Sequence, residues 1–283
     1  MSLKRKITNV ILKAIVYLSS SFTVLMLIGI IGYIFYKGIP VISWEFLTTS
    51  ESFIYDTFGI LPNILNTFYV ILLTLVIVLP LGIGAAVYLN EYATSKRLVS
   101  TVETAVETLA AIPSIIYGLV GMLFFRELLG FGMSLTSGCL TLVVMILPTI
   151  VRTTQESLRT VPQSYREGAI GLGSTKWHSI RTIILPNSLD GIVTGCILSI
   201  GRIVGESAAL LYTAGLTAGV VTNIFEAYSK AGGTLSVALY LYVNERGNFD
   251  AGFGIAAVLM FIVLVINMFT KMTQRLLKKR KDK

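Results

Sequence analysis

The sequence predicts an all-α polytopic membrane protein with six transmembrane helices. Of its 283 residues, 54% are hydrophobic and only 13% are charged, whereas soluble domains carry about 25% charged residues. The mean hydropathy is +0.78. The period-2 alternation of a β-barrel is absent from the apolar runs. Because lipid offers the backbone no hydrogen-bond partners, these runs are expected to be helical.

Six apolar stretches approach the roughly 20 residues that a helix needs to cross a bilayer. They cover residues 14–36, 67–89, 104–125, 133–151, 192–212 and 253–270. The first is longer than the roughly 7–15 apolar residues of a signal peptide and ends without a small-residue cleavage site, so we expect an uncleaved helix. We expect residues 1–283 to form one transmembrane domain, because the loops leave no room for a separate soluble one.

The basic residues predict the orientation in the membrane. Most of the 23 Lys and Arg residues lie at the two termini and in the loops after the second and fourth spans. The exceptions are Lys37, Arg126, Lys230 and Arg246 in the other loops, and Arg202 within a span. Since cytoplasmic loops are rich in Lys and Arg, both termini are predicted to be cytoplasmic, in the cell (inner) membrane. The same distribution argues that the net charge of +8 does not indicate a nucleic-acid partner.

The longest cytoplasmic loop, residues 152–188, contains a compact helical pattern. Pro162 is expected to end the preceding helix. Ser164 and Glu167 have the S-x-x-E spacing of a capping box, which predicts a new helix from Tyr165.

The second half of this loop predicts another short helix. Gly171 and Gly173 would form a joint, because glycine permits a tight turn and the close approach of another backbone. The next helix is expected over 175–184, closing before Pro186. The glycines also resemble the start of a phosphate-binding P-loop, but the required Lys is missing at Ser174 and no strand precedes it. An intrinsic ATPase is therefore not expected.

The fifth span contains two charged residues, Arg202 and Glu206. Each charge inside a membrane costs about 2.5–3.5 kcal/mol on insertion scales, so ionisable residues there indicate function by default. Their i,i+4 spacing would let them pair. A guanidinium also suits a tetrahedral oxyanion. Two interpretations stay open: part of an anion pathway or gate, or an Arg–Glu pair that locks the helix to a neighbour.

The third span contains Pro113 and Ser114, followed by small residues. The proline would kink the helix, as a packing feature or as a flexible gate in the pathway. Before this span, Ser100 and Glu103 have the spacing of a capping box. The carboxylates of Glu103 and Glu107 would then be stabilised by the helix dipole, or would line an inner vestibule.

The loop pattern E-G-A-x3-G-x9-I-x-L-P resembles the EAA loop of ABC importer permeases, with Gly168 in place of the family's first alanine. In that family the loop is a coupling helix that docks on a cytoplasmic ATPase. The resemblance implies an ATPase-coupling role for the matching positions, which are Glu167, Gly168, Ala169, Gly173, Ile183, Leu185 and Pro186.

The runs around Pro113 and Arg202, together with residues 59–67, resemble the phosphate-specific permeases of the PstA/PstC family, which have the type I ABC importer fold. The short amino-terminal region looks more like the PstA branch. The resemblance implies a heterodimer with a PstC-like permease, a PstB-like ATPase dimer and an extracytoplasmic phosphate-binding protein. ATP and Mg²⁺ would bind to the partner ATPase, and no cofactor is expected in this chain. Arg202, Glu206, Pro113 and Ser114 become candidates for phosphate passage or gating.

Three alternatives follow from the sequence. A guanidinium fits several oxyanions, so an ABC permease for sulfate or molybdate stays open. A secondary transporter or channel is disfavoured by the EAA loop and by the lack of an internal repeat. A membrane enzyme would need clustered catalytic side chains, whereas the chain has one histidine, His178, and two cysteines, both in apolar runs. A metal site or disulfide framework is not expected either.

Overall fold

The computed structural model describes residues 3–52, 57–216 and 223–281 and confirms the helical membrane fold. Four of its helices are long and apolar enough to cross a membrane, and two bent helix pairs raise the number of candidate spans to six. The four are α1 (Leu3–Gly38), α3 (Leu61–Val87), α6 (Leu135–Thr160) and α14 (Phe249–Lys281). They correspond to the first, second, fourth and sixth predicted spans.

The third predicted span is not a continuous helix. It is divided into α4 (Lys96–Ala111) and α5 (Ser114–Gly121), the latter extended by a π-helical segment over Met122–Leu128, and the two parts are bent by 98°. Ile112 is extended, with φ −69° and ψ 131°, as expected for the residue before a proline. Pro113 therefore lies at a sharp change in the direction of the chain. This bend is much larger than the kink that the sequence predicted.

The fifth predicted span is also interrupted. Helix α10 (Leu189–Gly205) ends before Glu206, which is extended, and α11 (Ala208–Thr213) begins two residues later. At its other end, α10 is bent by 64° from the preceding helical segment. The prediction of an unbroken helix over 192–212 is wrong.

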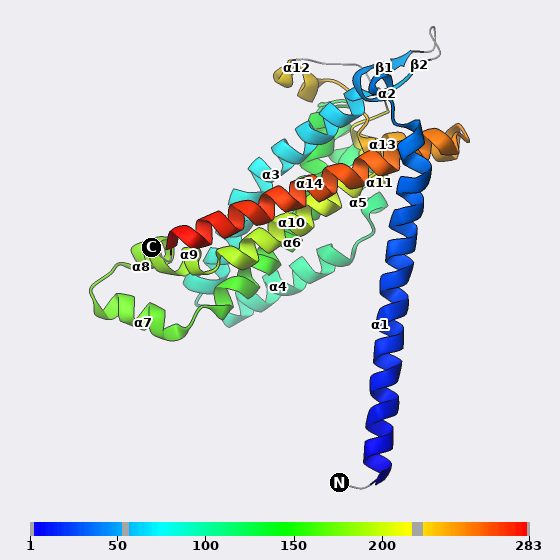
Figure 1. Ribbon diagram of the computed structural model, residues 1–283. Helices are drawn as coiled ribbons and strands as arrows, with labels where there is room; N and C mark the ends of the chain where they lie inside the picture. Colours follow the sequence, from blue (N-terminus) through cyan, green and yellow to red (C-terminus); the bar gives the residue numbers. More distant parts are fainter. Residues whose placement is uncertain (1–2, 53–56, 217–222, 282–283) are drawn as a thin grey trace.

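Helices α3, α6 and α10 form the centre of the bundle, and α14 runs alongside them (Figure 1). A Cβ at Gly82 of α3 would lie 2.5 Å from Cγ2 of Ile150 in α6, so the side chain of Ile150 packs directly against the backbone of α3. The buried core between them includes Val78, Leu142 and Ile146. Because close-packed interiors transmit strain, α3 and α6 are expected to move together.

Short elements cover one end of the bundle (Figure 1). They are a 3-10 turn (Ile39–Val41), α2 (Trp44–Thr48), the antiparallel strands β1 (Ser50–Ser52) and β2 (Thr57–Ile60), and α12 (Ile224–Ser229). Helix α13 (Leu235–Tyr240) and a π-helical turn over Leu241–Glu245 follow. Leu235 and Val237 of α13 are buried in the bundle.

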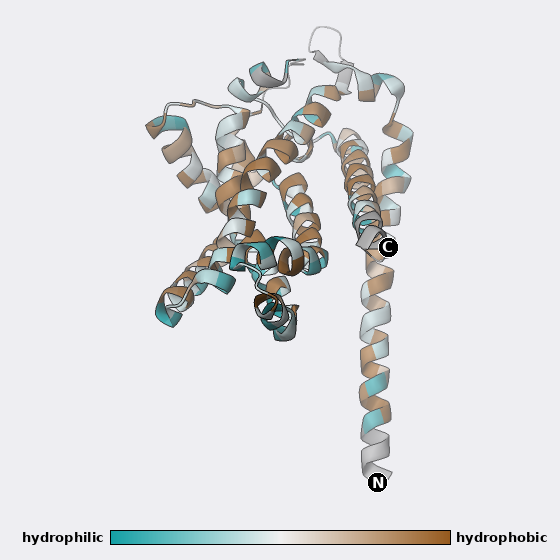
Figure 2. Ribbon diagram, turned by 90° about the vertical axis from the view of Figure 1, so that its left-hand side faces the viewer, coloured by the Kyte–Doolittle hydropathy of each residue, from teal (hydrophilic) through white to brown (hydrophobic). Residues whose placement is uncertain are grey.

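Helix α1 stands apart from the bundle over most of its length (Figure 1). It is apolar over most of its turns (Figure 2), and none of its most hydrophobic window is buried. Only its end packs closely, where the rings of Tyr33 and Phe253 of α14 meet edge to face at 5.6 Å. A Cβ at Gly38 would lie 2.4 Å from the carbonyl oxygen of Phe253, so this end approaches the α14 backbone.

The loop between α6 and α10 is mostly helical and projects from the opposite end of the bundle (Figure 1). It contains α7 (Gln163–Gly171), α8 (Lys176–Ser179), a π-helical segment over Ile180–Ile184, and α9 (Leu185–Asn187). A π-helical turn over Tyr88–Tyr92 extends α3 toward this loop.

Candidate functional site

The helical loop between α6 and α10 has the predicted glycine joint. Helix α7 ends at a tight turn in which Gly173 has φ +80°. The amide of Gly173 donates to the carbonyl of Ile170 at 2.9 Å, and the amide of Ser174 donates to that of Ala169 at 3.0 Å. These two bonds are the Schellman arrangement, which requires a left-handed residue and favours glycine.

The ends of these helices differ from the prediction. Helix α7 begins at Gln163, directly after Pro162, and no side chain caps it. The predicted capping box is therefore wrong, because the fixed φ of proline already starts the helix two residues earlier. The second helical stretch does begin at Thr175, whose hydroxyl accepts from the amide of His178, but it continues through Pro186 as α9. Pro186 lies in the first turn of α9, where its missing N–H is tolerated.

The second predicted capping box, at Ser100, is also wrong. Helix α4 begins earlier and is capped by Ser95, so Glu103 lies in the middle of the helix. There Glu103 pairs with Arg159 at the end of α6. Glu103 and Glu107 line a small cavity of about 120 Å³ together with Arg159.

The tip of the loop presents exposed apolar side chains outside the bundle. Leu172 is 90% exposed, and Tyr165, Ile170 and Trp177 are also exposed. Among the predicted coupling residues, the structure places Glu167, Gly168 and Gly173 on this exposed surface, with Ala169 buried beneath it and Ile183, Leu185 and Pro186 half-buried. Leu172 was not among the predicted coupling residues, although a leucine between two glycines in a polar loop is a recognisable signal.

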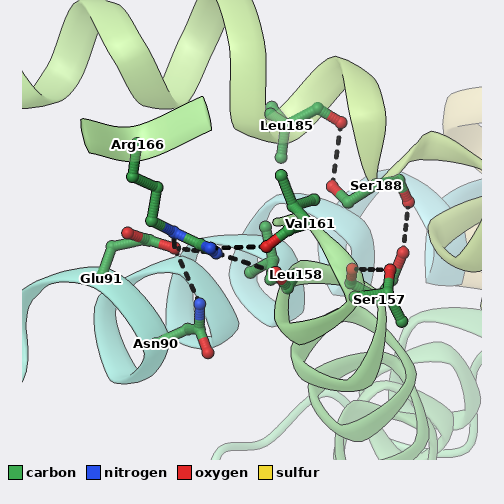
Figure 3. A network of polar contacts seen from close by, with 9 residues as sticks. Asn90, Glu91, Ser157, Leu158, Val161, Arg166, Leu185 and Ser188 are labelled. Atoms are coloured by element: carbon green, nitrogen blue, oxygen red, sulfur yellow. Dashed lines mark hydrogen bonds and ion pairs between the residues drawn. The ribbon is translucent and has the colours of Figure 1, made fainter. Parts of the chain in front are cut away.

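Arg166 connects α7 to the bundle (Figure 3). Its Nη2 lies 3.0 Å from Oε1 of Glu91, in the π-helical end of α3. The same guanidinium donates to the carbonyls of Leu158 and Val161, at the end of α6, at 2.9 and 2.7 Å. The Nδ2 of Asn90 donates to the same Glu91 oxygen at 2.7 Å. Neither Arg166 nor Glu91 was among the functional residues predicted from the sequence.

The interruptions of the two bent spans lie close together in the bundle. Helix α5 packs against α11 so tightly that a Cβ at Gly118 would lie 2.8 Å from Cα of Ala209. The hydroxyl of Tyr117 donates across the bend to the carbonyl of Leu109 at 2.7 Å. Pro113 and Ser114 are one turn before Tyr117, so the structure brings them to the same region as Glu206.

Glu206 joins the two halves of the broken fifth span. Its carboxylate Oε1 accepts from the amide of Ala209 at 3.0 Å, at the start of α11. Its backbone carbonyl accepts from the hydroxyl of Ser236 in α13 at 2.7 Å. The break therefore satisfies its own polar groups, as an irregular backbone within a membrane must.

Arg202 is in a different environment from the one expected. Within the described part of the chain it forms no ion pair with Glu206, because α10 ends before Glu206 and the i,i+4 geometry is lost. Its guanidinium lies within electrostatic reach of Tyr117. Gly201 and Gly205 on the same face of α10 have no neighbouring atoms within 4 Å of a Cβ position, and Leu198 is 55% exposed. Arg202 thus lies on a face that the described chain leaves uncovered.

An all-helical membrane chain with two interrupted spans and a protruding helical loop has the architecture of a transport permease. Residues 78–283 match the family described as binding-protein-dependent transport system inner membrane component, and the chain belongs to this family. It is therefore a multi-pass inner membrane subunit of a transport system, and not an enzyme.

Similar proteins of comparable length are known from several bacteria. The chain is 36% identical over 279 residues to the "Probable ABC transporter permease protein YqgI" of Bacillus subtilis, covering 94% of this chain and 95% of that protein. It is 31% identical over 285 residues to the "Phosphate transport system permease protein PstA 1" of Mycobacterium tuberculosis strain H37Rv, covering 96% and 89%.

Solved structures share the fold at low sequence identity. A bacterial alginate ABC transporter, crystallised with an alginate-bound periplasmic protein, matches with a TM-score of 0.72 at 18% identity, over 98% of both chains. The inward-facing MetNI methionine ABC transporter matches with a TM-score of 0.60 at 22% identity, over 77% of this chain and 94% of the other. The fold is that of a type I ABC importer permease, as the sequence predicted.

Proposed function

We propose that this chain is a permease subunit of an ATP-driven importer of inorganic phosphate and forms half of the translocation pathway. The observation that carries the proposal is Arg202, on an uncovered face of α10 beside the break at Glu206. A guanidinium within a membrane span is stabilised by a passing anion, and its fork matches two oxygens of a phosphate. Relatives named as phosphate transport permeases support phosphate over other oxyanions.

The uncovered face implies a second permease. In this proposal a PstC-like partner completes the pathway opposite α10, and an extracytoplasmic phosphate-binding protein delivers the substrate. A PstB-like ATPase dimer binds ATP and Mg²⁺, so this chain needs no cofactor of its own. Residues 1–283 act as one permease domain, with both termini and the loop over 152–188 on the cytoplasmic side, in agreement with the distribution of basic residues. ATP-driven closure of the ATPase opens the pathway outward, and hydrolysis resets it.

The exposed tip of the loop supports docking on the ATPase. Leu172 and Trp177 offer apolar area that the chain itself does not bury. The loop carries an excess of basic residues, including Lys176 and Arg181. Its complement is an apolar socket with an acidic rim, because charge complementarity guides such contacts.

Transport measurements test the substrate. In cells whose other phosphate importers have been removed, loss of this chain is expected to abolish uptake of radiolabelled phosphate at micromolar concentration. A large excess of sulfate should not compete with uptake in cells that contain the chain. Unchanged phosphate uptake on deletion would contradict the proposal, and competition by sulfate or molybdate would assign the permease to another oxyanion.

A substitution at the loop tip tests the docking. Leu172→Glu is expected to weaken ATPase binding by about 10- to 150-fold, because burying a leucine contributes roughly 1.5–3 kcal/mol. Co-purification of the ATPase with the tagged permease, followed by a binding titration in detergent, measures the effect. Leu172→Met retains the apolar area and should bind as the wild type does. Equal binding by the Glu and Met variants would rule out this tip as the docking surface.

A further inference from the structure

We propose that Arg166 and Glu91 are positioning residues that make α7 move as one body with the adjoining ends of α3 and α6. The inference rests on the proposed function, since it assumes that α7 receives a movement from the ATPase. The link would act in the step after docking, in which a displacement of the loop is transmitted to the membrane helices.

Helix α7 has little other attachment to the bundle. All nine of its residues are described, and Ala169 is the one among them that is buried. A cavity of about 440 Å³ lies beside α7, lined by residues that include Asn90, Gln163, Lys176 and Ser179. A helix that borders a cavity lacks the close packing that would hold it by shape alone. Its side-chain link through Arg166 therefore determines its position.

The Arg166–Glu91 pair differs from the other ion pairs of the described chain by its burial. The side chains of Arg166 and Glu91 are 16% and 7% exposed. In each of the other pairs at least one side chain is more than half exposed. Exposed pairs are screened by water and contribute little, whereas breaking a buried pair leaves an uncompensated charge. This pair is thus expected to hold its geometry while the exposed pairs exchange with solvent.

The guanidinium reaches two membrane helices at once. Its Nη2 donates to both Glu91, at the end of α3, and the carbonyl of Leu158 in α6 (Figure 3). Its Nε also donates to Glu91, and its Nη1 donates to the carbonyl of Val161. The last carbonyls of a helix have no partners within it and carry partial negative charge, so a cation there is favourable. A lysine could not make these contacts together, because its ammonium lacks the planar fork.

The far end of the loop is tied to the same helix. The hydroxyl of Ser157 in α6 donates to the carbonyl of Ser188 at 2.6 Å, and the hydroxyl of Ser188 donates to that of Leu185 at 2.9 Å (Figure 3). Both ends of the loop are therefore anchored within one turn of each other on α6. Since α3 and α6 pack closely along the core, a displacement of α7 moves both.

The ratio of phosphate transported to ATP hydrolysed tests this role. In proteoliposomes that contain the complete complex, Arg166→Gln and Glu91→Gln are expected to lower this ratio at least fivefold, with ATPase still bound. The double variant should match the single ones, because each removes the same link. Arg166→Lys should fall between them and the wild type. Lys230→Gln, which breaks the exposed pair with Glu226 at the opposite end of the bundle, is the matched control.

A distance measurement tests the rigid link without using any substrate. Spin labels at Ser164→Cys on α7 and Tyr88→Cys on the end of α3 occupy exposed positions. With Glu91 present, the distance between the labels should be the same with and without bound ATP. With Glu91→Gln, it should shift or broaden on ATP binding.

Three outcomes separate the two proposals. A normal transport-to-ATP ratio and an unchanged distance in Arg166→Gln would overturn the positioning role and leave the proposed function intact. Loss of the permease from the membrane in both Arg166→Gln and Arg166→Lys would mean that the pair serves folding alone, which also overturns it. Failure of the wild-type chain to bind any ATPase would instead refute the proposed function.

Discussion

Replacing Arg202 by glutamine is expected to reduce phosphate uptake by roughly 10- to 150-fold while the complex still assembles. A hydrogen bond to a charged group contributes about 1.5–3 kcal/mol, which corresponds to this range. The side chain lies on the uncovered face of α10 and forms no ion pair within the described chain, so its loss leaves no partner unpaired. Uptake of radiolabelled phosphate and the yield of purified complex measure the two effects.

Two further variants distinguish pathway from packing at this position. Arg202→Lys retains the charge without the planar fork and should keep part of the uptake. Arg126→Gln, which removes a charge paired with its neighbour Glu127, should leave uptake unchanged. If Arg202→Gln lowered the yield of complex while the complex that did form transported normally, Arg202 would be a packing residue and the phosphate pathway would lie elsewhere.

Substituting Gly173 is expected to have the second largest effect. Its φ of +80° is disfavoured for every residue with a Cβ, at a cost of about 1–2 kcal/mol. A Cβ there would meet nothing within 4 Å in this chain, so the penalty is conformational and not steric. Gly173→Asp adds a charge that an acidic socket on the ATPase would repel. We expect it to weaken ATPase binding at least tenfold while the permease still inserts.

The neighbouring Gly171 provides a matched control. It is the last residue of α7, has ordinary helical backbone angles and has equally open surroundings. Gly171→Ala should preserve ATPase binding, since alanine favours a helix by about 1 kcal/mol over glycine. Gly173→Ala should weaken binding through backbone strain alone. Equal binding by these two alanine variants would show that the turn is not part of the docking surface.

The membrane helices could be predicted where hydropathy alone decides them. The spans that became α1, α3, α6 and α14 are continuous, and their apolar runs were sufficient evidence. The third and fifth spans were wrongly predicted as unbroken. The helix can end at Glu206 because groups distant in sequence supply hydrogen bonds to the freed backbone. One of them is the hydroxyl of Ser236. The mean hydropathy of a stretch of residues contains no information on such partners.

The candidate site shows the same limit. The spacing from Glu167 to Pro186 predicted the helical loop and its glycine joint, because both are local. The contact between Arg166 and Glu91 joins residues 75 positions apart, and a single sequence does not indicate it. The predicted pairing of Arg202 with Glu206 failed for a related reason. It assumed one continuous helix, and the structure ends α10 between the two residues.

The position of α1 constrains the biosynthesis of this protein. Its close contacts are with α14, which is synthesised about 210 positions after it, since the two helices are joined by the intervening spans. Before Phe253 has been synthesised, α1 lacks the helix against which it packs. It therefore stays exposed to lipid while the intervening spans are inserted. The contact between α1 and α14 therefore forms after the spans that lie between them in the sequence. A ribosome stalled before α14 would release a product whose central helices can pack but whose first helix stays untethered.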